Sequence, residues 1–287
     1  MSKLYVINNA KQKEPFSWKK AYLSARRVGA PKPLAKDIAT LIEDKAYPGI
    51  STQEIFRTIK QVLRKELPFA GIRFNLKAGI RKLGPSGFPF EKYAGEIFKQ
   101  QGYFLTYNQF IKGGCIEHET DFVAKKKNKL LLAECKYHHL PGNRVDTRVV
   151  EYTYAAFLDF QKGSFLKKQE KQGAIPQPLI VTNTKFTSQA IKYAHCVKMN
   201  LLGWRYPKDK GLEYWIESQK MYPITILPSF KRSLVDTFMR ERIMLAKDLL
   251  SLDSFKFAKK MGLPQKDVAA LVAEAKILFP KEQNLKK

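Results

Sequence analysis

The pattern of hydrophobic and polar positions predicts two adjoining strands near the middle of the chain. The runs ETDFVAK (119–125) and KLLLAECKY (129–137) are joined by a short turn of lysine and asparagine. Side chains on a strand alternate between two faces, so Glu134 and Lys136 share one face of an otherwise apolar strand. Pairing of the two strands in a hairpin brings Asp121 close to Glu134. The pattern therefore predicts two carboxylates and one ammonium group at one end of a hairpin.

This grouping of charges has a chemical use. Two carboxylates supply the hard oxygen ligands that Mg²⁺ or Mn²⁺ prefers, while the metal keeps positions for water and a phosphate oxygen. A lysine beside them can orient the attacking water and offset charge that grows on the phosphate. From the residues alone, an ordinary surface hairpin with a Glu–Lys pair explains the pattern equally well.

Helical spacing of apolar residues dominates the first 84 residues. A short strand or hairpin at LYVIN precedes four predicted helices. Ser51 and Glu54 have the spacing of a capping box, which marks the start of the third helix. The predicted helices lie in PFSWKKAYLSARRVGA, PLAKDIATLIEDKAY, GISTQEIFRTIKQVLRKEL and FAGIRFNLKAGIRKL.

Helical spacing returns at the other end of the chain, where 226–287 reads as a set of helices. The segment GPSGFPF (84–90) is rich in glycine and proline and is a natural domain boundary. We therefore expect three domains, which are a small helical domain over 1–84, a central domain over 85–225 that contains the hairpin, and a helical domain over 226–287 that is a candidate for DNA binding.

Composition changes this picture in two ways. Hydrophobic content of 44% and aromatic content of 12% predict a folded protein. The start of the chain is too polar for a signal peptide, no apolar run is long enough for a transmembrane helix, and three cysteines without CxxC spacing favour neither disulfides nor zinc. These features predict a cytoplasmic protein in a reducing compartment, without a membrane partner.

Charge indicates the partner. Lys and Arg number 52 against 26 Asp and Glu, which gives a net charge of +26 spread over the whole chain. Such a field attracts polyanions and makes binding depend strongly on salt. DNA is the partner that we expect. A basic proteome, in which every protein is basic, is the alternative explanation.

The hairpin residues resemble the D-x(n)-ExK core of the PD-(D/E)XK nucleases, and among these the restriction-endonuclease-like enzymes of the Mrr type. The likeness spans about 90–225, although His118-Glu119-Thr120-Asp121 replaces the usual proline before the first acid. It implies an α/β fold with a mixed central sheet flanked by helices, and metal-dependent cleavage of DNA. Asp121 and Glu134 would bind the metal and Lys136 would position water. The helix FEKYAGEIFKQQGY (90–103) would supply a third acid, Glu96.

The first domain resembles the ATP-cone, a nucleotide-binding regulatory module of ribonucleotide reductases. The segments that carry the likeness are VINNAKQKEPFSWKKA, YPGISTQEIF and RFNLKAGI. It implies that Lys20 contacts a phosphate of ATP or dATP. The Lys-Arg pair of the family is replaced by Asn8 and Asn9, so two cations that would contact phosphate are missing. The alternative is that the domain does not bind a nucleotide and serves only in DNA binding or packing.

Five cations are candidates for DNA contacts. Lys125, Lys126 and Lys127 crowd the predicted hairpin turn, where they either contact phosphates or protect a hydrophobic hairpin from aggregation. Arg144 and Arg148 precede or open the helix that follows the hairpin, where they can hold the cleaved strand.

Together these features predict an endonuclease. A defence or repair role fits nucleases of this group, and the resemblance to the ATP-cone implies regulation by a nucleotide. A homodimer is expected if both strands of a duplex are cut, because this takes two active sites. Two alternatives stay open. One is a non-catalytic, nucleotide-responsive DNA-binding regulator, and the other is a nuclease specific for junctions or flaps.

Overall fold

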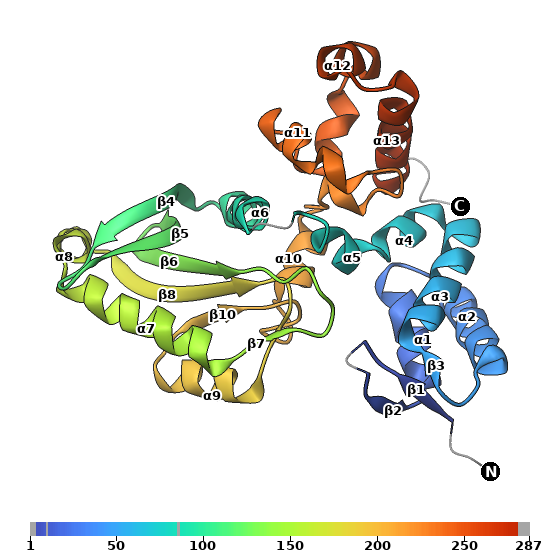
Figure 1. Ribbon diagram of the computed structural model, residues 1–287, viewed down its shortest axis with the longest axis horizontal. Coiled ribbons are helices and arrows are strands. Elements are labelled where there is room, and N and C mark those ends of the chain that lie inside the picture. Colours follow the sequence, from blue (N-terminus) through green and yellow to red (C-terminus); the bar gives the residue numbers. More distant parts are fainter. Residues whose placement is uncertain (1–3, 10, 85–86, 281–287) are drawn as a thin grey trace. The chain divides into compact units, whose positions relative to one another are not determined.

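The computed structural model describes residues 4–9, 11–84 and 87–280 (Figure 1). The chain forms two compact units, and each is described by itself. The first unit combines the described residues up to Ile80 with those from Pro223 onward, and the second runs from Arg81 to Tyr222. The first unit thus contains residues from both of the helical domains expected over 1–84 and 226–287. No helix among the described residues is long and apolar enough to cross a membrane.

A small sheet and a helical bundle begin the first unit. The sheet has the order β2-β1-β3, with β2 antiparallel and β3 parallel to β1. Ser51 caps the third helix by accepting a hydrogen bond from the amide of Glu54 (3.1 Å), as its position in the sequence predicts. The elements are β1 (Tyr5–Ile7), β2 (Lys13–Pro15), α1 (Trp18–Arg27), α2 (Lys32–Lys45), β3 (Ile50–Ser51) and α3 (Thr52–Glu66).

Contacts between distant parts of the sequence complete the first unit. Helices α4 (Pro68–Arg73) and α5 (Leu76–Ile80) pack against segments from the end of the chain, and the Thr225 hydroxyl donates to the carbonyl of Gly79 (2.7 Å). Local hydrophobic spacing does not reveal such contacts, which is why three domains were expected. The later elements are η1 (Ile224–Ile226), η2 (Arg232–Leu234), α11 (Val235–Arg240), η3 (Ala246–Ser251), α12 (Ser254–Met261) and α13 (Gln265–Leu278).

The second unit is built on a mixed five-stranded sheet of order β10-β8-β6-β5-β4. Strand β5 is antiparallel to both of its neighbours, β4 and β6, whereas β6, β8 and β10 run parallel to one another. The strands are β4 (Phe104–Lys112), β5 (Glu117–Lys126), β6 (Lys129–Lys136), β8 (Ile175–Thr182) and β10 (Asn200–Leu202), beside a small pair, β7 (Arg144–Val145) and β9 (Lys185–Phe186). The expected mixed central sheet flanked by helices is therefore present.

Helices cover both faces of this sheet (Figure 1). On one face Phe98 of α6 packs against Phe122 of β5, with ring centroids 5.5 Å apart. On the other face Phe157 of α7 joins Val123 and Leu132 in one core cluster. The helices are α6 (Phe88–Gln100), α7 (Thr147–Lys162), α8 (Ser164–Lys171), α9 (Ser188–Cys196) and α10 (Leu212–Ser218).

Candidate active site

Asp121 and Glu134 lie on adjacent strands at the point where those strands separate. The paired register of β5 and β6 ends with Phe122 opposite Ala133, the residues directly next to the two acids. Beyond it, Oδ2 of Asp121 accepts a hydrogen bond of 2.6 Å from the backbone amide of Cys135. The side chain of Asp121 thus continues the contact between the strands, and the predicted neighbourhood of the two carboxylates is present.

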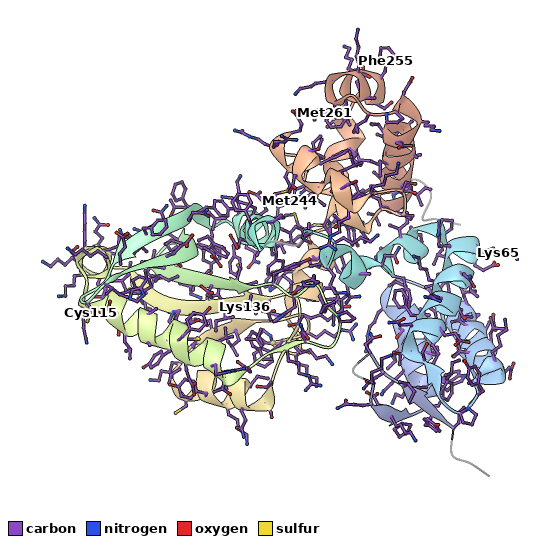
Figure 2. The ribbon with its side chains drawn as sticks, viewed as in Figure 1. Lys65, Cys115, Lys136, Met244, Phe255 and Met261 are labelled. Carbon is purple, nitrogen blue, oxygen red and sulfur yellow. The ribbon has the colours of Figure 1, made fainter. Side chains whose placement is uncertain are left out.

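Glu134 and Lys136 both approach Tyr152 of helix α7. The Tyr152 hydroxyl donates to Oε1 of Glu134, and the Lys136 ammonium lies 5.9 Å from the centroid of the Tyr152 ring. Lys136 is the last residue of β6 (Figure 2). The hydroxyl of Thr182 on β8 donates to the carbonyl of Lys136 (2.6 Å), which holds the end of that strand in place. The hairpin thus presents both carboxylates and the ammonium group together.

The carboxylates of this site repel one another. Burial raises the pKa of Asp121 to about 7, and the charge of Glu134 adds to the rise, while the Cys135 amide opposes it. Burial also raises the pKa of Glu134, against the lowering effects of Tyr152 and Lys136. A cation bound between these groups would relieve their repulsion.

The helix acid that faces this site is Glu91 and not Glu96. Glu91 raises the pKa of Asp121, and its own pKa is raised by burial and then by the charges of Glu119 and Glu134. Glu96 instead forms an ion pair of 3.7 Å with Lys99. The two glutamates are about 140° apart around the helix, because an α-helix turns every 3.6 residues. The structure thus brings Glu91, and not the predicted Glu96, into the electrostatic environment of the two hairpin acids.

The donor set fits Mg²⁺ or Mn²⁺. No group of three His, Cys, Asp or Glu side chains, within the part of the chain that the structure describes, is arranged to hold a metal ion alone. Mg²⁺ does not need such a cage, because it usually keeps several waters and binds through one or two carboxylates. Asp121 and Glu134 are two such carboxylates, and the charges of Glu119 and Glu91 add to the negative charge around Asp121.

The three turn lysines lie away from the carboxylates. Lys126 pairs with Lys129 at the closed end of the hairpin, and Glu134 is about 16 Å further along β6 at about 3.3 Å per residue. Lys125 donates to Gln169 (2.9 Å) and Lys126 to the carbonyl of Gln101 (2.5 Å). Lys127 is exposed in the turn. The three residues are thus not the immediate wall of the site.

Of the two arginines, Arg148 is the better placed. It lies in the first turn of α7, one turn before Tyr152, and its guanidinium group forms an ion pair of 2.7 Å with Asp146. Its side chain is 88% exposed, so it is free to contact a large ligand. Arg144 is exposed on β7, which pairs with β9 in a separate two-stranded sheet.

A cavity of about 280 Å³ opens beside Glu134, between the sheet and α7. Local hydrophobic spacing does not predict this cavity, since residues of three strands and one helix line it together. The residues that line it include Glu119, Thr120, Glu134, Tyr152, Thr153 and Phe157.

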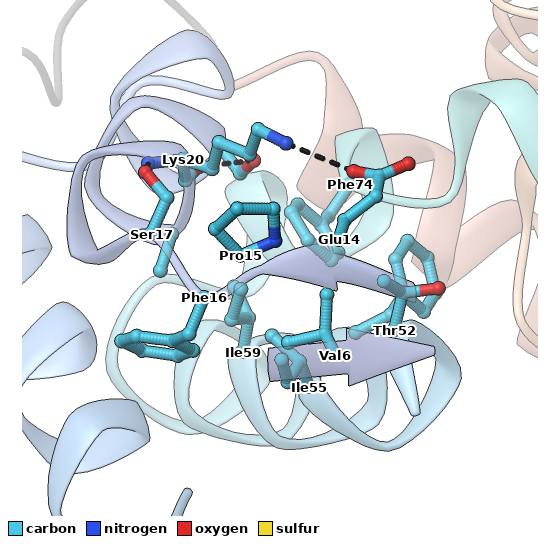
Figure 3. Close-up of a pocket in the computed structure, with 13 residues that line it drawn as sticks. Val6, Glu14, Pro15, Phe16, Ser17, Lys20, Thr52, Ile55, Ile59 and Phe74 are labelled. Carbon is cyan, nitrogen blue, oxygen red and sulfur yellow. Dashed lines mark hydrogen bonds and ion pairs between the residues drawn. The ribbon is translucent and has the colours of Figure 1, made fainter. Parts of the chain in front are cut away.

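The first unit contains a second cavity, of about 180 Å³ (Figure 3). Lys20 is at its edge, but its ammonium group forms an ion pair of 3.0 Å with Glu14. Asn8 donates to the same carboxylate (2.6 Å), and Asn9 accepts from Gln53 (3.3 Å). Lys20 and Asn8 therefore converge on Glu14. The apolar wall of the cavity consists of Val6, Phe16, Ile55, Phe56, Ile59 and Phe74.

Comparisons with known proteins identify relatives. The structure of MspJI restriction endonuclease in complex with an oligonucleotide matches 75% of this chain and 52% of the MspJI chain, with a TM-score of 0.26 at 11% identity. This likeness is too weak to support any conclusion about the fold or the function. The crystal structure of AF1548, a protein of unknown function, has a TM-score of 0.56 at 34% identity, over 67% of this chain and 98% of the AF1548 chain.

Sequence comparison agrees with this structural likeness. An uncharacterized protein of Archaeoglobus fulgidus is 37% identical over 182 residues, which is 63% of this chain and 96% of that protein. Residues 222–279 match the model of the C-terminal region of AF1548-like proteins. The chain therefore belongs to the family of AF1548-like proteins.

Proposed function

We propose that this protein is a metal-dependent endonuclease that hydrolyses phosphodiester bonds of DNA. The observation that carries the proposal is the meeting of Asp121, Glu134 and Lys136 at one end of two adjacent strands. Two carboxylates whose pKa values are raised by burial, and then by neighbouring acids, are costly to keep in a half-buried position. Such an arrangement is typical of functional sites, where strongly shifted pKa values concentrate.

Each side chain has a role in this proposal. Asp121 and Glu134 would hold Mg²⁺ or Mn²⁺, with Glu91 and Glu119 adding negative charge around them. The metal, when bound, supplies positive charge that stabilises the transferring phosphoryl group. Lys136 would orient the attacking water and offset the charge that develops on the phosphate oxygens. Tyr152 holds the carboxylate of Glu134 in place through its hydroxyl.

DNA is the substrate that the net charge of +26 favours. The turn cations Lys125, Lys126 and Lys127 would contact the backbone at some distance from the cleaved bond, whereas Arg148 would contact it nearby. Arg144 would add a further backbone contact. These are contacts to phosphate, so they fix the position of the duplex without reading its sequence. Binding is expected to weaken steeply as salt is raised.

The test of this proposal separates binding from cleavage. Asp121→Ala should abolish metal-dependent cleavage while it leaves the affinity for DNA in a chelator unchanged, because Asp121 is not one of the cations that contact phosphate. Loss of binding in parallel with cleavage would overturn the role given to Asp121. Binding without cleavage by the wild-type protein would instead favour the non-catalytic DNA-binding regulator.

The shape of the DNA target is tested by competition between branched and linear duplexes. A preference for junctions or flaps would make the protein a structure-specific nuclease. Cleavage of both strands of a plain duplex takes two sites, so a homodimer is expected there. Mass measurement in solution, with and without DNA, tests that state. A defence or a repair role is compatible with either target.

A second proposed function is regulation by ATP or dATP, as in the ATP-cone. The cavity of the first unit combines an aromatic pair, Phe56 and Phe74 with ring centroids 4.6 Å apart, with the cation Lys20 at its edge. Asn8 and Asn9 would contribute hydrogen bonds in place of charge. Phosphate would have to compete with Glu14 for Lys20, because these two side chains form an ion pair.

Calorimetric titration of ATP and dATP tests this second function. Lys20→Ala should lower the affinity, whereas the neighbouring exposed Lys19→Ala should not. Equal titration curves for wild type and Lys20→Ala would remove Lys20 from the site.

A further inference from the structure

The cavity beside Glu134 has room for one flat ring system. Its volume of about 280 Å³ lies just below the about 300–1,000 Å³ of pockets that take drug-sized ligands. Phe157 and Phe160 of α7 and Leu132 of β6 provide apolar surface. The carboxylates of Glu119 and Glu134 stand in its polar wall, so a phosphate group is repelled from it. An uncharged aromatic ring is the kind of group that this cavity accommodates.

The polar wall offers hydrogen-bond acceptors. The Thr120 hydroxyl donates its proton to the carbonyl of Ala133 (3.1 Å), and the Thr153 hydroxyl donates to the carbonyl of Val149 (2.8 Å). Each hydroxyl therefore has only lone pairs left for a ligand. The Tyr152 hydroxyl is likewise used, because it donates to Glu134. A ligand that satisfies this wall must bring its own donors.

Amino-bearing nucleobases combine these two properties. Adenine, cytosine and guanine each carry an exocyclic amino group, whereas the one donor of an unpaired thymine, its N3–H, lies between two carbonyl oxygens that a wall of acceptors repels. A base enters such a pocket only after it leaves the stack, and this costs least when the base is mismatched, bulged or single-stranded. Aromatic side chains such as Phe157 favour an unstacked base, because they replace part of the lost stacking.

We propose that this cavity receives one unpaired, amino-bearing base of the DNA next to the bond that is cleaved. The proposal rests on the proposed nuclease function for its substrate, and it narrows that substrate to DNA with an unpaired nucleotide. The base enters between β5 and α7, and its amino group donates to the hydroxyl of Thr153. The adjoining phosphate then lies outside the cavity, toward Asp121 and Lys136.

Binding of bulged duplexes in EDTA tests the proposal without any cleavage. Four hairpin duplexes carry a single bulged position that is adenine, cytosine, thymine or an abasic site. The wild-type protein should bind the bulged adenine and cytosine at least fivefold more tightly than the bulged thymine or the abasic site. Equal affinity for all four duplexes would overturn the proposal. Because no metal is present, this result stands apart from the success or failure of the nuclease assay.

Two variants of α7 locate the preference in the cavity. Ala156→Phe places a ring in the cavity that Ala156 lines, and it should remove the preference while overall affinity is kept. Ala155→Leu is the matched control, because Ala155 is exposed on the same helix, and it should keep the preference. A preference that survives in Ala156→Phe would place base recognition elsewhere and overturn the assignment.

A conservative variant guards against a misfolded Ala156→Phe protein. Thr153→Val keeps the shape of the side chain and removes its hydroxyl, which is the acceptor offered to the base and the donor to the carbonyl of Val149. It should reduce the ratio of adenine to thymine affinity and leave the affinity for the thymine duplex unchanged. An unchanged ratio in a folded Thr153→Val protein would show that the hydroxyl is not used, and would count against the proposed recognition.

Discussion

The side chain of Asp121 accepts a hydrogen bond of 2.6 Å from the backbone amide of Cys135, one residue beyond Glu134 on the neighbouring strand. This bond fixes the first acid of the site against the strand that carries the second. It also stabilises the ionised form of Asp121, yet burial and the charge of Glu134 still raise the pKa of Asp121 to about 7. The position of Asp121 is thus held by the backbone at a cost in electrostatic energy.

Replacement of Asp121 by asparagine should stabilise the metal-free protein at alkaline pH. A carboxyl whose pKa is higher in the folded than in the unfolded protein does not lower the free energy of unfolding at a pH below its unfolded pKa of about 3.9. Above that pH it lowers the free energy of unfolding increasingly, until the pH passes the folded pKa of about 7. A difference of about three pKa units corresponds to about 4 kcal/mol in the free energy of unfolding. Asparagine keeps the acceptor for Cys135 and does not titrate.

Thermal unfolding in EDTA measures this effect. The melting temperature of Asp121→Asn relative to wild type should rise much more at pH 8 than at pH 4.5. An equal difference at both pH values would mean that Asp121 has an ordinary pKa and that the electrostatic account of the site is wrong.

Glutamine in place of Glu91 should slow cleavage, whereas glutamine in place of Glu96 should not. Glu91 shares the electrostatic environment of Asp121 and Glu134, while Glu96 pairs with Lys99. The two variants make the same change in charge on the same helix, so each controls for the other. The rates of cleavage at saturating metal are compared. Loss of activity in Glu96→Gln alone would restore the assignment made from the sequence.

Phenylalanine in place of Tyr152 should move the acid limb of the pH–rate profile to higher pH. The Tyr152 hydroxyl lowers the pKa of Glu134, so its removal raises that pKa and Glu134 ionises later as pH increases. Tyr154→Phe, on the same helix with its ring packed against the core, is the control and should leave the profile in place. An acid limb that stays fixed in Tyr152→Phe would exclude Glu134 as the group that titrates.

Local patterns were sufficient for the hairpin and insufficient for what surrounds it. Alternation along β6 correctly predicts that Glu134 and Lys136 share a face. The same reasoning misses β4, because Phe104 and Phe110 lie on its exposed face, so both faces of the strand carry apolar side chains although burial alternates along it. These two aromatic residues do not mark a buried face, so the strand gives no clear periodic signal.

Helix α6 shows a different limit. It is buried around most of its circumference, with Phe90, Tyr93, Ile97 and Phe98 all in the core. Its hydrophobic pattern therefore does not indicate which glutamate faces the sheet, and only the packed structure separates Glu91 from Glu96. The joining of the first and last segments into one unit is equally invisible, because it depends on contacts such as that of Thr225 with Gly79.

The central claim is that the protein cleaves DNA with a metal held by Asp121 and Glu134. The most direct test compares cleavage of supercoiled plasmid DNA by the wild-type protein and by Glu134→Gln, with Mg²⁺, with Mn²⁺ and with EDTA. Glu170→Gln is the control, since it makes the same change at an exposed position on α8. We predict metal-dependent cleavage that Glu170→Gln retains and that Glu134→Gln slows by about a hundredfold or more. Cleavage by Glu134→Gln at the wild-type rate, or no metal-dependent cleavage by a wild-type protein that binds the plasmid tightly, would contradict the account.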